Sequence, residues 1–213
     1  MDKTTGGLTF AAAVLTVFAV LVVLTVYHLF FPPAGDATTK DTTTPSTATK
    51  CNTLLYPPVK DETKFAVAIN GYIMLYGQPR SPLNGLGSVF LDAGKKFNIN
   101  PAYVINIARK ESSFGLYVPP GSYNPYGRTA TESQPHVDFN GRLWYRSDSW
   151  AASATDESDY LKVVYADLGL ITVEQITYKY APPGENNTEQ YIKQMNSWIN
   201  EVIKMAGDSL ECQ

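Results

Sequence analysis

The chain has 213 residues and a formal net charge of −3, with a pI near 5.4. This length suits one globular domain with appendages. The acidic balance and the lack of a run of Lys or Arg argue against nucleic acid as a partner. No Cys or His cluster has the spacing of metal ligands, so we expect no metal and no other cofactor.

A long apolar segment occupies residues 8–31, where the side chain nearest to a charged one is His28. A helix needs about 20 such residues to cross a bilayer, so we expect an uncleaved transmembrane anchor. A secretory signal peptide is the alternative. The segment is longer than a typical signal core, however, and Phe31–Gly35 is a poor small-x-small cleavage site.

The basic residues around this segment predict its orientation. Lys3 precedes the segment, whereas the first basic residue after it is Lys40. The positive-inside rule therefore places residues 1–7 in the cytoplasm and the rest of the chain beyond residue 31 outside it. We expect a single-pass membrane protein with an extracytoplasmic C-terminal domain.

A Thr- and Pro-rich composition follows, and we assign residues 32–58 to a flexible linker and residues 59–213 to the folded domain. Cys51 and Cys212 stand near the two ends of that domain. In an oxidising outer compartment a disulfide between them would join both ends, and the alternative is two unrelated thiols.

Apolar periodicity and capping residues predict a mostly helical domain of the α+β type. Asn100 suits an N-cap and Pro101 the first helical position, so one helix should end near Ser112. Asn140-Gly141 between apolar residues predicts a small hairpin within 138–145. The expected helices span 60–76, 86–97, 101–112, 156–168 with Gly169 as a C-terminal cap, 172–180 with a capping box, and a final helix from Thr188.

Glu111 is the main candidate for chemistry, because it lies in the last turn of the helix 101–112, before a Gly- and aromatic-rich loop. Poor solvation beside aromatic rings and the negative end of a helix both raise the pKa of a carboxyl. Such an acid can give a proton to a leaving sugar oxygen. The alternative is an ordinary exposed carboxylate.

Four local motifs carry a resemblance to a known family. They are Glu111–Gly115, Asn124–Gly127, Trp144–Ser147 followed by Asp159–Leu161, and Lys179–Pro182 followed by Asn186, Asn187 and Tyr191. In this order they resemble the glucosaminidase domains of peptidoglycan hydrolases, glycoside hydrolase family 73, which are mannosyl-glycoprotein endo-beta-N-acetylglucosaminidase-like. The resemblance spans roughly residues 86–204. It implies a lysozyme-like fold, no metal, and cleavage of the β-1,4 bond after N-acetylglucosamine with Glu111 as general acid.

The resemblance also implies roles for other residues. A second carboxylate would lie on the hairpin lobe, where Asp138 and Glu132 are the candidates, although a substrate-assisted route through the sugar acetamido group would need neither. Tyr180 would lie beside the acid. The substrate-binding candidates are Asn124, Tyr126, Phe114, Tyr123 and Tyr191.

Peptidoglycan or a related wall glycan is therefore the expected partner, together with the membrane through residues 8–31. Two other functions stay open. One is a lysozyme-like lytic transglycosylase, in which a single Glu serves as acid and base. The other is a non-catalytic wall-binding module within a larger surface assembly.

Overall fold

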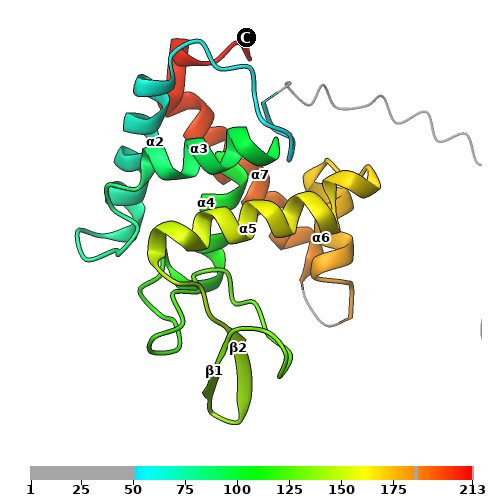
Figure 1. Cartoon of the computed structure of the whole chain (residues 1–213). Helices are drawn as coiled ribbons and strands as arrows, with labels where there is room; N and C mark the ends of the chain where they lie inside the picture. The colour runs from blue at the N-terminus through cyan, green and yellow to red at the C-terminus, as the bar shows by residue number, and fades with distance from the viewer. Residues whose placement is uncertain (1–50, 185–186, 213) are drawn as a thin grey trace, which may run out of the picture. The chain divides into compact units, whose positions relative to one another are not determined.

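A computed structural model describes residues 51–184 and 187–212 (Figure 1). The predicted anchor at 8–31, the cytoplasmic segment 1–7 and most of the predicted linker lie outside these residues. Within the described ranges, no helix combines the length and apolarity needed to span a bilayer.

The described part is mostly helical with one small hairpin, as predicted (Figure 1). Its elements are α2 (Glu62–Gly77), α3 (Gly87–Phe97), α4 (Pro101–Ser112), β1 (His136–Phe139), β2 (Arg142–Tyr145), α5 (Trp150–Val164), the 3-10 turn η1 (Ala166–Leu168), α6 (Val173–Tyr180), α7 (Thr188–Ala206) and the 3-10 turn η2 (Gly207–Ser209).

Two predicted helix boundaries were wrong. Helix α5 begins at Trp150 rather than at Asp156, because the Ser149 hydroxyl caps it by accepting from the amide of Ala152 at 3.0 Å. It ends at Val164, and the turn η1 follows before the predicted cap at Gly169. The capping box at Thr172 is confirmed.

Helix α4 forms the centre of the domain and packs against α2, α3, α5 and α7. Its residues from Pro101 to Ala108 are all buried. The predicted N-cap is confirmed, since the Asn100 side chain accepts from the amide of Ala102 at 2.9 Å. At the other end Ser113 and Phe114 adopt left-handed backbone conformations, with φ of 51° and 59°. The helix therefore stops one residue after Glu111.

The hairpin β1–β2 is antiparallel and turns at Asn140-Gly141, whose φ values of 56° and 72° suit a tight primed turn. A third segment runs beside β2. The amide of Tyr145 donates to the carbonyl of Arg128 at 3.0 Å, and the amide of Ala130 donates to that of Leu143 at 3.0 Å. The hairpin is thereby tied to the loop that follows Gly127.

The chain segment before α2 belongs to the folded domain. Leu54 is fully buried, its amide donates to the carbonyl of Ile171 at 2.8 Å, and its carbonyl accepts from the amide of Asn100 at 2.6 Å. Residues 51–58, which we assigned to the linker, therefore pack on the helices. The predicted disulfide between Cys51 and Cys212 is confirmed, with Cα atoms 5.5 Å apart.

This disulfide should stabilise the domain strongly, because it closes a loop with a sequence separation of 161. We expect the double variant Cys51→Ser/Cys212→Ser to be about 2–5 kcal/mol less stable than the wild type. Urea unfolding of the full chain with and without a reductant measures this. The reductant should destabilise the wild type and leave the double variant unchanged. Equal sensitivity of both proteins would contradict the expectation.

Candidate active site

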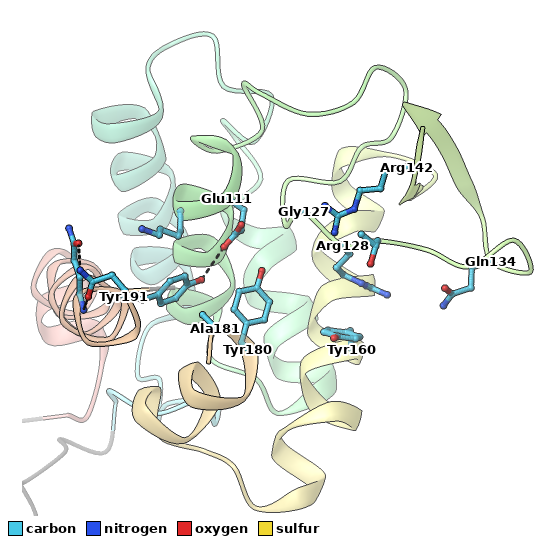
Figure 2. Close-up of a pocket in the computed structure, with 13 residues that line it drawn as sticks. Glu111, Gly127, Arg128, Gln134, Arg142, Tyr160, Tyr180, Ala181 and Tyr191 are labelled. Carbon is cyan, nitrogen blue, oxygen red and sulfur yellow. Dashed lines mark hydrogen bonds between the residues drawn. The ribbon is translucent and has the colours of Figure 1, made fainter. Parts of the chain in front are cut away.

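A cavity of about 770 Å³ opens at the C-terminal end of α4. Figure 2 shows that its walls come from α4, from the loop after Gly127, from the hairpin and α5, and from the end of α6 with the start of α7. The lining residues are Lys110, Glu111, Gly127, Arg128, Thr129, Gln134, Arg142, Tyr160, Tyr180, Ala181, Asn187, Gln190 and Tyr191.

Glu111 faces this cavity with one carboxylate oxygen held in place. The phenol of Tyr191 donates to Oε1 of Glu111 at 3.1 Å (Figure 2). Loss of solvation in the concave site raises the pKa of Glu111, while the phenols of Tyr191 and Tyr180 and the charge of Lys110 act to lower it. The pKa lies above the ordinary value, in the direction predicted from the sequence.

Tyr180 and Tyr191 stand together beside Glu111, with ring centroids 6.0 Å apart. The hydroxyl of Thr188 donates to the carbonyl of Ala181 at 2.6 Å and so joins the end of α6 to the start of α7. Burial, followed by the nearby Glu111 carboxylate, raises the pKa of both phenols well above the ordinary value. Both hydroxyls are therefore protonated donors at neutral pH.

The other oxygen of Glu111 lies against a glycine. Gly127 has a φ of +66°, and a Cβ built on it would lie 3.5 Å from Oε2. The hydroxyl of Ser112 fixes this turn, since it donates to the carbonyl of Pro125 at 2.7 Å and accepts from the amide of Gly115 at 2.8 Å. The two sequence motifs therefore meet through one side chain.

Arg128 forms part of the cavity wall and is held on several sides. Its guanidinium lies 4.2 Å from the ring centroid of Tyr145 and 4.3 Å from that of Tyr160. Nη1 donates to the carbonyl of Asp156 at 3.3 Å and lies 3.7 Å from Oε2 of Glu157. Two cation–π contacts, the hydrogen bond to Asp156 and the nearby Glu157 carboxylate restrict the movement of this guanidinium.

Glu157 lies behind the cavity wall and is only 3% exposed. Burial raises its pKa to about 7, with a further increase from the charge of Glu111 and an opposing effect from Arg128. Its Oε2 has no hydrogen-bond partner among the described residues. Two carboxyls with raised pKa values therefore influence each other across this wall, although only Glu111 faces the cavity.

Several predicted substrate-binding residues lie elsewhere. Asn124 and Tyr126 are each 2% exposed and do not line the cavity. The Asn124 amide instead accepts from the amide of Arg128 at 3.2 Å and donates to its carbonyl at 2.7 Å. Phe114 is buried in the core against Tyr72, and Tyr123 packs its ring on Trp150. These residues shape the turn and the core.

Asp138 and Glu132 are on the hairpin lobe as expected, but both are exposed and neither lines the cavity. Among the described lining residues, Glu111 alone carries a carboxyl. Sequence reasoning missed Lys110, Arg128 and Arg142 in the wall. Lys110 and Arg128 could have been found from the sequence only because they are next to Glu111 and Gly127, and Arg142 has no such neighbour.

No protein-family model matches the chain, and no curated protein matches it. One solved structure with detectable similarity is the C-terminally truncated glycoside hydrolase domain of FlgJ from Salmonella typhimurium. The identity is 18%, the alignment covers 63% of this chain and 97% of that domain, and the TM-score is 0.42. The proposal below therefore rests on the site itself.

The buried carboxyl of Glu157 should make stability depend on pH. Its folded-state pKa of about 7 lies above the ordinary 4.5, so its contribution is present below about pH 4.5 and is lost as the pH rises toward 7. We expect Glu157→Gln to reduce this loss by a few kcal/mol at most. Urea unfolding at about pH 3.5 and about pH 8, each about a unit outside the interval from 4.5 to 7, measures this pH dependence. The exposed-site control Glu132→Gln should keep the wild-type slope, and an unchanged slope in Glu157→Gln would contradict the assignment.

Proposed function

We propose that the chain is a glycan hydrolase that cleaves the β-1,4 bond after N-acetylglucosamine in peptidoglycan, with Glu111 as general acid. The observation that carries this proposal is a carboxyl with a raised pKa that lines a large open cavity and accepts a hydrogen bond from a tyrosine. A proton donor with these properties suits the glycosidic oxygen of a bound glycan.

The two carboxylate oxygens of Glu111 have different surroundings. Oε1 accepts from Tyr191, which disfavours a proton there, whereas Oε2 faces the glycine turn. We assign the transferable proton to Oε2. As the bond between the anomeric carbon and the leaving oxygen breaks, this proton moves to the leaving oxygen and Glu111 becomes a carboxylate.

Among the described residues that line the cavity, only Glu111 carries a carboxyl, which favours a mechanism with one protein acid. In the proposed route the acetamido oxygen of the substrate bonds to the anomeric carbon as the leaving group departs. A water then opens that cyclic intermediate and gives a proton to ionised Glu111, which restores the acid. The phenol of Tyr180, beside Glu111, is placed to orient the acetamido group or the water.

The presence of one carboxyl among the described lining residues also favours a second candidate, a lytic transglycosylase. There a hydroxyl of the sugar itself, in place of water, bonds to the anomeric carbon, and the product is an anhydro sugar. Mass spectrometry of the released fragments separates the two, since the hydrolase product is heavier by one water. Fragments that all carry the anhydro end would replace the first proposal with the second.

We also propose that residues 8–31 anchor the chain in a membrane with its N-terminus in the cytoplasm and the domain outside. The disulfide between Cys51 and Cys212 supports an oxidising compartment for the domain. A wall glycan would be reached from that side.

The variant Glu111→Gln should lose at least about 100-fold of the wall-clearing activity, because an amide cannot donate the proton. A zymogram with wall material in the gel measures this. Asp138→Asn and Glu132→Gln are matched controls that should clear like the wild type. Equal clearing by Glu111→Gln would refute the catalytic role, and a loss in Asp138→Asn would restore the hairpin as the source of a second acid. Wild-type protein that sediments with wall without clearing it would indicate a binding module.

Tyr191→Phe should move the pH dependence of the activity. Removing the phenol takes away a contact that lowers the pKa of Glu111, so this pKa rises. Because the acid must be protonated, the alkaline limb of kcat/KM should move to higher pH by the same amount. Tyr178→Phe is a matched control, since Tyr178 bonds Glu189 away from the cavity. An alkaline limb that stays in place would show that Tyr191 does not tune the acid.

A further inference from the structure

The cavity has the opposite charge balance to the chain. The chain carries a formal −3, whereas the described residues that line the cavity include three cations, Lys110, Arg128 and Arg142, and one carboxyl, that of Glu111. Loss of solvation raises the pKa of Glu111, which disfavours even that negative charge. Like charges gathered in one concave wall repel one another and attract an anionic ligand.

The three cations differ in how far the protein neutralises them. Arg128 lies beside the buried Glu157 at 3.7 Å. Lys110 donates to the neutral amide of Gln194 at 2.8 Å, and Arg142 stacks on Trp144 with 4.8 Å to the ring centroid. Within the described residues, no salt bridge involves Lys110 or Arg142. Both are exposed, so their charges are available to a ligand.

The cations also surround the acid from different elements. Lys110 precedes Glu111 on α4, whereas Arg142 extends from β2 toward the turn at Gly127 (Figure 2). Arg128 follows that turn, and its guanidinium contacts the rings of Tyr145 and Tyr160. A glycan that places a bond at Glu111 therefore passes between positive groups on both sides.

We propose that the cavity recognises carboxylate groups carried by the glycan, and that Arg142 and Lys110 are specificity-determining residues for them. This inference rests on the proposed function for the glycan class. Neutral sugars are bound through hydroxyl hydrogen bonds and ring stacking and need no cluster of cations. A guanidinium, in contrast, matches a carboxylate with two parallel hydrogen bonds.

The test is equilibrium binding of the full chain in detergent, with Glu111→Gln present in every protein to prevent turnover. One ligand is soluble wall glycan with free carboxyls, and the other is the same glycan after its carboxyls are converted to methylamides. Isothermal titration calorimetry at low and high salt measures both affinities. We expect tighter binding of the carboxylated glycan, with an advantage that shrinks at high salt.

Arg142→Gln should weaken binding of the carboxylated glycan by about three- to fivefold and binding of the neutral glycan by less than about twofold. Lys110→Gln should act in the same direction. Arg146→Gln is a matched control, because Arg146 is an exposed arginine directly after β2 that does not line the cavity. It should leave both affinities unchanged.

Two results would overturn the inference. One is equal or undetectable binding of the two glycans by the parent protein, and the other is an equal loss for both glycans in Arg142→Gln. Failure of the proposed hydrolysis has a separate signature. Wild-type chain that cleaves neither glycan, while the carboxylated one still binds more tightly, refutes the enzyme and leaves the recognition intact.

Discussion

The hydroxyl of Ser112 makes the connection on which the site depends. It bonds the carbonyl of Pro125 and the amide of Gly115 at once, so the turn at Gly127 is fixed to the end of α4. Together with the hydrogen bonds of Asn124 to the backbone of Arg128, this connection holds the glycine backbone beside Oε2 of Glu111. Since Ser112 is itself buried, its hydrogen bonds are also costly to leave unmade. A change at Ser112 would therefore affect both the position of Glu111 and the stability of the domain.

Glu111 and Glu157 both have a raised carboxyl pKa, but they lie in different surroundings. Glu111 ends a helix at the edge of solvent, and Glu157 is enclosed by α5 and its neighbours. Burial is the largest cause of the pKa increase at both. Only Glu111 has access to a ligand, however, so Glu157 acts through Arg128 and through the field that it adds to the site.

Much of this arrangement could be predicted from local sequence signals. Asn100 and Pro101 define the start of α4, and Asn140-Gly141 defines the hairpin, because each states a backbone requirement that few residues meet. The predicted end of α4 near Ser112 also placed Glu111 correctly in the last turn of this helix. The proximity of Glu157 to Arg128 could not be predicted, because it depends on how α5 packs beside the turn.

The errors at the site have a related cause. Asn124 and Tyr126 belong to a motif next to the acid, and motif residues were expected to contact the sugar. The Asn124 side chain instead holds the turn that presents Gly127 and Arg128, and the Tyr126 ring is buried in the core. A residue can thus be essential near a site without facing it, and only three-dimensional packing separates the two cases.

The disulfide gives the domain a mechanical property. Cys51 is covalently joined to the chain just beyond α7, and the hairpin lies at the other end of the domain (Figure 1). A tensile load that arrives at Cys51 passes directly into the segment after α7. Such a load therefore reaches the segment around Leu54 only after that covalent link is reduced. Tension applied at Cys51 is therefore carried by the disulfide and the segment after α7, at the end of the domain opposite the hairpin (Figure 1).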